Sequence, residues 1–385
     1  MPPEQGLARV AAMRVALIGG PQYDQIDEAL TRFTDTTGIA VDVGFRGDHP
    51  AVNRHLGEAL PEGRYDLIST HTKYVPSQAH WLQTLEEPVA DRFHPTALAL
   101  ARIDGRLLSL PRNIDVRLLW LRRDVLGEAE PPATWDDLAE LAATVVADGG
   151  HAGFAFPGFG SGLFGTFYEL TVAHGGHLFD GAGRPTLSTP ETGTALGWLV
   201  DAHRRRRLTP AGLPDWSFDD VSAAFRQGAV ALAGDWPGYY GLLVEAGLRD
   251  LVDVARYPAG PAGRAVYAGC HSFAVPSAAS YPEEALALLD HLTSVDAVTL
   301  DAAAGMVPAR LDVPIAVGHP LDQRRSDLLA ATIAEDVLTF PPLVHYPALE
   351  DAAADLLRAA LLGRLPVTEA LALAQQRALT ISDRA

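Results

Sequence analysis

The stretch RVALIGGPQYDQIDEALTRF, residues 14–33, decides the fold class. Its apolar run Val15 to Ile18 has the length of a buried strand and breaks at two glycines and a proline. Ile26, Leu30 and Phe33 then recur at the spacing of one helix face. A strand that leads directly into an amphipathic helix is the first half of a β-α-β unit.

The same alternation continues downstream of this stretch. The pattern predicts a strand over 39–45, a helix over 52–60 and a strand over 65–69. Strands that alternate with helices are typical of a parallel sheet whose faces are covered by helices. The first seventy residues therefore indicate an α/β unit.

A second α/β unit follows. Thr134 is placed to cap a helix over 135–146, and a strand resumes at 154–156. Between the two units, NIDVRLLWLRRDVL, residues 113–126, predicts a long strand that runs into a helix and can cross from one lobe to the other. The run AVYAGCHSFAVP, residues 265–276, predicts one further strand.

Composition and charge exclude several classes of protein. The 385 residues carry 30 Lys+Arg against 48 Asp+Glu, and the formal net charge of −18 argues against binding to a phosphate backbone. Lys73 is the only lysine, so a phosphate-cradling Gly-Lys-Ser/Thr loop cannot occur. The single cysteine excludes an intramolecular disulfide and a cysteine-built metal site. We expect no nucleic-acid partner and, because no run of about 18 apolar residues occurs, no membrane insertion.

Two motifs imitate cofactor or catalytic sites. GSGLFG, residues 160–165, fits G-x-G-x-x-G, but the next acid, Asp180, lies in a turn-rich connection instead of at the end of a second strand. We interpret this segment as a glycine-rich loop whose backbone donors meet a neutral ligand. Cys270 and His271 are neighbours in a predicted strand, so they point to opposite faces and cannot form a nucleophile-base pair. The scattered histidines show no metal-ligand spacing, so we expect neither a metal nor a cofactor.

Aromatic rings beside carboxylates or amides suggest a ligand-binding role. Sugars stack on rings while planar polar side chains bind their hydroxyls, and ligands of α/β sheets bind at the ends of strands. Such groups fall at expected strand or loop ends: Tyr23-Asp24, His71 to Tyr74, Asn113 to Arg117, Asp215-Trp216 and Asp235-Trp236. For each of them a role as a cap or in the core is an equally open interpretation, and for Arg117 and Trp120 a role in the fold is favoured.

With these residues assembled, the chain resembles the solute-binding proteins of carbohydrate importers of the ATP-binding-cassette (ABC) type, the maltodextrin-binding-like family. The segments that carry the resemblance are TGIAVDV, YDLISTHTKYVPSQAHWLQTLEE, DGRLLSLPRNIDVRLLWLRRDVL, PPATWDDLAELA, SGLFGTFYELTVAHGGHLFD, VSAAFRQGAVALAGDWPGYY and AGCHSFAVP. The resemblance implies an α/β, two-lobed periplasmic-binding-protein-like fold of type II. Each lobe would be a mostly parallel sheet flanked by helices, with hinge segments crossing between the lobes.

The resemblance also implies lobe boundaries and ligand contacts. We expect an N-terminal lobe of 13–116 plus 267–312, a C-terminal lobe of 117–266 plus 313–385, and a loose leader at 1–12. The implied ligand-binding residues are Tyr23, Asp24, His71, Tyr74, Asn113, Asp115, Ser161, Phe164, Asp235, Trp236, His271 and Arg310, and the aromatic pattern adds Trp216. No catalytic residue and no metal ligand are expected.

The implied function is binding of a saccharide or sugar derivative between hinged lobes, as the solute-binding component of an ABC sugar transporter. The protein would then be a monomer that hinges, extracellular or periplasmic, with a membrane permease as its partner. The apolar run at Val15 to Ile18 is too short for a signal peptide, so without a removed signal the chain would be cytoplasmic. This departure leaves two alternatives open: a cytoplasmic sugar-binding sensor, and a glycoside-acting enzyme with Asp24, Asp115 or Asp235 as acid or base.

Overall fold

A computed structural model describes residues 12–20, 22–87, 92–315 and 318–384. The chain divides into two compact units: unit 1 comprises 1–114 and 269–315, and unit 2 comprises 115–268 and 316–385. The chain therefore passes between the units three times, at 114–115, 268–269 and 315–316. The leader expected at 1–12 lies, up to residue 11, outside the described residues.

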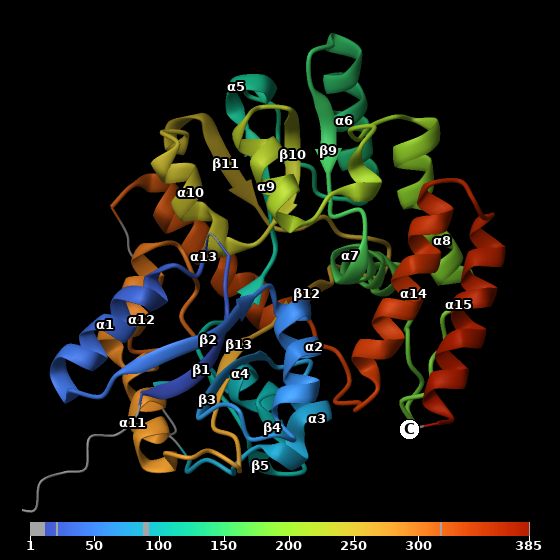
Figure 1. Ribbon diagram of the computed structural model, residues 1–385. Helices are drawn as coiled ribbons and strands as arrows, with labels where there is room; N and C mark the ends of the chain where they lie inside the picture. The colour runs from blue at the N-terminus through green and yellow to red at the C-terminus, as the bar shows by residue number, and fades with distance from the viewer. Residues whose placement is uncertain (1–11, 21, 88–91, 316–317, 385) are drawn as a thin grey trace, which may run out of the picture. The chain divides into compact units, whose positions relative to one another are not determined.

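Unit 1 is built around a five-stranded sheet (Figure 1). Its strand order is β2 (Val41–Gly47), β1 (Met13–Ile18), β3 (Leu67–His71), β13 (His271–Ala274) and β6 (Leu110–Pro111). β1 pairs in parallel with β2 and β3, as the strand-helix alternation predicts. β13 pairs antiparallel with both β3 and β6, so the sheet is mixed and the expectation of a mostly parallel sheet is wrong here. A parallel neighbour needs a crossover connection, and β13 enters this sheet from unit 2 instead.

Helices of unit 1 pack on this sheet and on one another. α1 (Gln25–Thr37) buries Ile26, Leu30 and Phe33, the residues whose spacing predicts its inner face. It ends at Gly38, which adopts the left-handed conformation with φ 75° that glycine accepts without steric cost. The remaining elements are α2 (His49–Ala59), α3 (Val75–Gln78), η1 (Ala79–Trp81), α4 (Pro95–Leu100), β4 (Arg102–Ile103), β5 (Arg106–Leu107), α11 (Pro282–Leu292) and α12 (Val295–Ala303).

Unit 2 contains a four-stranded and a three-stranded sheet. In the larger sheet the order is β11 (Val252–Ala255), β8 (Leu118–Arg122), β10 (Val230–Asp235) and β9 (Ala152–Ala155). Only β10 and β9 pair in parallel; β8 pairs antiparallel with both β10 and β11. This sheet is therefore also mixed and not mostly parallel. The smaller sheet has the order β14 (Val337–Leu338), β12 (Val266–Gly269) and β7 (Asp115–Val116).

Two strands that the sequence predicts as continuous are divided in the structure. The run 113–126 forms β7 and β8 on either side of Arg117, followed by α5 (Arg123–Leu126). The two strands belong to different sheets, and the side chain of Arg117 between them is buried in an ion pair with Glu169. The run 265–276 forms β12 and β13, which belong to different sheets because the chain leaves unit 2 at 268–269.

Helices complete unit 2. Thr134 caps α6 (Trp135–Asp148) as predicted: its side chain accepts a hydrogen bond from the Asp137 amide, and the Asp137 carboxylate accepts one from the Thr134 amide. The other helices are α7 (Gly160–Ala173), α8 (Pro190–Val200), the π-helical turn η3 (Asp201–Arg205), η4 (Leu213–Asp215), α9 (Phe218–Arg226), η5 (Pro237–Tyr239), α10 (Tyr240–Glu245), η6 (Arg249–Leu251), α13 (Pro320–Glu335), α14 (Tyr346–Leu361) and α15 (Val367–Ser382). Within the described ranges, no helix has the length and apolar character needed to cross a membrane.

Candidate ligand-binding residues

In unit 1 the candidate residues gather at one edge of the sheet. β3 ends at His71, and His271, the first residue of β13, is its direct partner in the antiparallel register. Tyr23 lies in the loop that follows β1. Because β1 and β3 are parallel, their carboxyl ends share this edge, where ligands of α/β sheets bind.

Five ring-bearing side chains contact one another at this edge; we call them the unit 1 ring cluster. The Tyr23 hydroxyl lies 2.7 Å from Nε2 of His271, whose ring centroid is 5.1 Å from that of His71. His49, at the start of α2, stacks on His71 with the ring centroids 5.5 Å apart. Its Nδ1 lies 3.2 Å from the Tyr74 hydroxyl. Sequence reasoning missed His49, because no spacing signal links the start of this helix to the ends of distant strands.

Backbone and amide groups orient two rings of the cluster. The amide oxygen of Asn113 accepts a hydrogen bond of 2.8 Å from the backbone N–H of His271. The backbone N–H of Lys73 donates to Nδ1 of His71 over 3.2 Å, so a neutral His71 carries its proton on Nε2. Gly269 leaves room for the same ring, because a Cβ at this position would lie 2.3 Å from Nε2 of His71.

Two cationic side chains accompany the unit 1 ring cluster. The Lys73 ammonium lies 5.0 Å from the ring centroid of Tyr74. The Arg112 guanidinium lies 5.6 Å from the ring centroid of Tyr23 and forms two hydrogen bonds of 2.6 Å with the Asp301 carboxylate. Neither Lys73 nor Arg112 is among the ligand-binding residues that the resemblance implies.

Burial keeps the three imidazoles of the cluster neutral. It lowers the pKa of His271 to about 3, and the positive charges of Arg112 and Lys73 act in the same direction. Burial also lowers the pKa values of His49 and His71 well below their usual range. At neutral pH each ring is therefore uncharged and has one N–H donor and one nitrogen acceptor. One nitrogen of each ring already has a partner within the cluster or the adjoining backbone: Nδ1 of His49, Nδ1 of His71 and Nε2 of His271.

In unit 2 the candidate residues lie at the end of β10. Asp235 is its last residue, and its carboxylate accepts a hydrogen bond of 2.8 Å from the backbone N–H of Trp236. Burial raises the pKa of Asp235 to about 8, although that hydrogen bond and one with Ser222 oppose the shift. Asp235 is therefore protonated at neutral pH and can donate a hydrogen bond. The half-buried ring of Trp236 lies 5.7 Å from the ring of Phe218.

The glycine-rich segment is a helix and not the loop that the sequence predicts. Gly160 has φ 57° and opens α7, which continues through the other glycines of the motif. A Cβ at Gly162 would lie 2.4 Å from that of Pro157, so this glycine permits close packing of the helix. Ser161 is half-buried in the first turn, whereas Phe164 is fully buried and contacts the rings of other helical residues: Phe167, Tyr168 and Tyr346.

The other candidate residues have varied surroundings. Asp24 is exposed directly before α1, and Asp115 is buried in β7 of unit 2. Trp216 is half-buried, and its carbonyl accepts a hydrogen bond from the Gly158 amide. Arg310 pairs with Asp312 and donates to the Thr293 carbonyl, contacts that tie it to the fold of unit 1.

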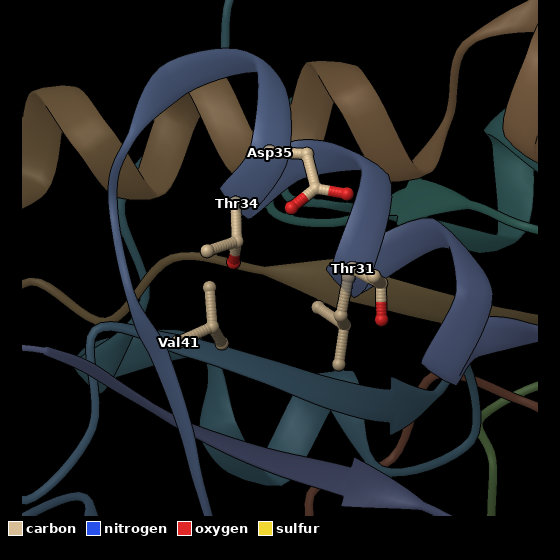
Figure 2. A pocket seen from close by; sticks show the side chains of 5 residues that line it. Thr31, Thr34, Asp35 and Val41 are labelled. Carbon is tan, nitrogen blue, oxygen red and sulfur yellow. The ribbon is translucent and has the colours of Figure 1, made fainter.

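Two surface pockets in the described parts of the chain contain none of the candidate residues. In unit 1, Thr31, Thr34 and Asp35 of α1 face Val41 at the start of β2, and Leu30 completes the pocket (Figure 2). In unit 2, the second pocket is lined by Thr134, Trp135, Asp136, His174, Ala259, Gly260 and Pro261. The described residues also include no group of three His, Cys, Asp or Glu side chains placed to hold a metal ion.

Comparisons with known proteins agree with this architecture. A family model described as bacterial extracellular solute-binding protein matches residues 69–299. A probable amino-acid ABC transporter periplasmic-binding protein of Sinorhizobium fredii is 26% identical over 357 residues, which cover 84% of this chain and 78% of that protein. A putative binding protein of Brucella abortus is 29% identical over 213 residues; the alignment spans 53% of this chain and 51% of that protein, about half of each.

Solved structures resemble the chain over nearly its whole length. Maltose-bound MalE3 of T. maritima has a TM-score of 0.86 and 24% identity, covering 95% of this chain and 99% of that one. A solute-binding protein of Thermotoga lettingae bound with α-D-tagatose has a TM-score of 0.84 and 23% identity, covering 97% and 100%. These likenesses confirm the predicted fold, that of the type II periplasmic binding proteins.

Proposed function

The chain belongs to the bacterial extracellular solute-binding proteins, and we propose that its solute is a saccharide or a sugar derivative. In this proposal the protein is the solute-binding component of an ABC-type importer, and a membrane permease is its partner. It acts as an extracellular or periplasmic monomer that hinges when the solute binds, without a catalytic step. The curated relatives are likewise named as binding proteins.

One observation carries the proposal: each unit presents rings beside polar groups at the end of a strand. In unit 2 the half-buried ring of Trp236 adjoins Asp235, which burial keeps protonated. In unit 1 the ring cluster combines two phenols with three neutral imidazoles. Apolar C–H faces of a sugar stack on rings, and its hydroxyls both donate and accept hydrogen bonds. We propose that each of these two groups can contact a saccharide.

A second candidate solute is an amino acid, because the relative from S. fredii is named for amino-acid transport. The unit 1 ring cluster favours the saccharide, since neutral imidazoles and phenols match hydroxyl groups better than they match an ammonium group. The solved structures named for maltose and tagatose also favour it.

A thermal-shift screen of the full chain tests the proposal. The panel contains maltose, tagatose, neutral mono- and oligosaccharides, sugar acids and amino acids, each rechecked for chemical change after long incubation. A ligand at about 100 times its dissociation constant stabilises the folded state by roughly 2.7 kcal/mol, which raises the melting temperature measurably. We expect a shift with a saccharide that is recovered unchanged.

The Trp236→Ala variant should lose that shift, while Trp236→Phe should retain part of it because phenylalanine keeps a ring. A shift with amino acids alone would replace the saccharide by the second candidate. Turnover of a glycoside would favour the enzymatic alternative with Asp24, Asp115 or Asp235. Equal shifts for the wild type and Trp236→Ala would refute the assignment of Trp236.

A further inference from the structure

A buried ion pair lies directly beside the ring of Trp236. The Arg117 guanidinium is 5.0 Å from the ring centroid of Trp236, and its side chain is only 1% exposed. Arg117 Nε is 3.1 Å from Oε1 of Glu169, and Nη2 is 3.0 Å from Oε2. Nη1 donates to the Thr166 hydroxyl over 3.0 Å. The guanidinium is thus held by one hydrogen bond to the Glu169 carboxylate, a second close ion-pair contact with it, and a hydrogen bond to Thr166.

The same carboxylate also holds a second strand. Oε1 of Glu169 accepts a hydrogen bond of 2.9 Å from the backbone N–H of Tyr267 in β12. The chain leaves unit 2 directly after residue 268, so Tyr267 precedes one passage between the units. Arg117 follows another passage, at 114–115. β12 and β7, which border these passages, are hydrogen-bonded neighbours in the small sheet.

We propose that Arg117 and Glu169 are positioning residues that connect the ring of Trp236 to the two chain segments 115–118 and 264–268. The inference rests on the proposed function, in which the solute stacks on Trp236. A solute on this ring favours one ring position, and the ring is in cation–π contact with Arg117. Arg117 cannot shift without disturbing Glu169, and Glu169 cannot shift without disturbing the Tyr267 amide.

The chemistry of the pair fits a connecting role better than one in stability alone. Moving two charges out of water costs free energy, and the attraction within a buried ion pair often does not recover it. Apolar residues of similar volume would often stabilise this core equally well. Burial raises the pKa of Glu169 to about 7 against the opposing effects of Arg117 and the Tyr267 amide. The planar guanidinium of Arg117 donates one hydrogen bond to Glu169 and one to Thr166. In contrast to an apolar contact, these bonds fix direction as well as distance.

Hydrogen exchange of the full chain without ligand tests the connection itself. Trp236 contacts Arg117, so we expect Trp236→Ala to speed exchange of the Tyr267 amide about tenfold and also to speed exchange within 115–118. Trp216→Ala removes a half-buried ring of the same size in the same unit and is the matched control. It should change exchange at Tyr267 by less than about twofold. Unchanged exchange at Tyr267 in Trp236→Ala would overturn the proposal, because a merely structural pair would not respond to the loss of this ring.

Three further variants and a measurement with ligand complete the experiment. Arg117→Lys keeps the charge but loses the planar guanidinium that bonds both Glu169 and Thr166, and it should speed exchange at Tyr267. Glu169→Gln should have the same effect. Asp253→Asn breaks the ion pair with Arg123 and should not change exchange at Tyr267. Maltose, or the panel member with the largest thermal shift, should slow exchange at Tyr267 in the wild type but not in Arg117→Lys. Binding without slower exchange at Tyr267 would refute the positioning role alone. Absence of binding by every saccharide would refute the proposed function alone. Hydrogen exchange of the ligand-free variants would still test whether Arg117 and Glu169 connect Trp236 to Tyr267.

Discussion

The Tyr23 hydroxyl and Nε2 of His271 lie 2.7 Å apart although 248 positions separate these residues in the chain. This contact joins the loop after the first strand of unit 1 to the first residue of β13. It exists because β13 pairs antiparallel with β3 and so begins at the sheet edge where β3 ends. The unit 1 ring cluster therefore depends on how the chain returns to this sheet.

Replacing Tyr23 by phenylalanine keeps the ring but removes the hydroxyl, which contacts Nε2 of His271 and accepts a hydrogen bond from the Gln22 amide. We expect Tyr23→Phe to lower the free energy of unfolding by about 1 to 2 kcal/mol and to weaken solute binding, as measured by urea denaturation and titration calorimetry. Tyr65→Phe is the matched control, since the Tyr65 hydroxyl also lies 2.7 Å from a histidine Nε2, that of His55, outside the cluster. It should lower stability similarly and leave solute affinity unchanged; an equal loss of affinity in both variants would contradict the assignment.

The buried histidine of this contact makes stability depend on pH. Burial lowers the pKa of His271 to about 3, whereas in the unfolded chain a histidine titrates near 6.5. Below about pH 6.5 the His271 ring is therefore protonated in the unfolded state but not in the folded state. The free energy of unfolding falls as the pH drops toward 3. His271→Gln cannot titrate. When the pH is lowered from 7 to 5, we expect the free energy of unfolding of this variant to rise by about 2 kcal/mol relative to that of the wild type. Denaturation curves at both values measure this gain, and a gap independent of pH would refute the prediction.

Asp235 shifts stability in the opposite direction. Its pKa is raised by burial to about 8, so the folded state keeps a proton that the unfolded state loses near pH 4. Between these values the free energy of unfolding falls as the pH rises, by roughly 1.4 kcal/mol per pH unit. Asp235→Asn retains the shape of the protonated side chain and cannot titrate. Its stability relative to the wild type should therefore improve steadily from pH 5 to pH 8, and a constant difference would show that Asp235 is ionised in the folded protein.

Gly269 should be required for the position of His71. Because a Cβ at Gly269 would lie 2.3 Å from Nε2 of His71, Gly269→Ala forces this ring away from His49 and His271. We expect a loss of solute affinity of about tenfold or more in calorimetric titration, equivalent to about 1.4 kcal/mol. Gly57→Ala, at a helical position with open space around it, is the control and should raise stability slightly. Unchanged affinity in Gly269→Ala would mean that His71 does not bind the solute.

Local patterns predicted much of the secondary structure. The spacing of Ile26, Leu30 and Phe33 indicated the inner face of α1, and Thr134 indicated the start of α6. These predictions hold because periodicity and capping involve residues within one or two turns of each other. The prediction of a loop at the glycine motif 160–165 was wrong because the motif is also a local pattern. It shows where side chains are absent, but not that Gly162 lies in a helix and packs against Pro157.

By itself, the sequence determined the strand-helix alternation and the resemblance to a solute-binding family. Only the tertiary structure decided that both main sheets are mixed, that His49 joins His71 and His271, and that one carboxylate, Glu169, holds both Arg117 and Tyr267. The physical reason is the separation of the interacting residues along the chain. Periodicity is set by neighbouring residues, whereas strand direction and buried charge pairs depend on where distant parts of the chain meet.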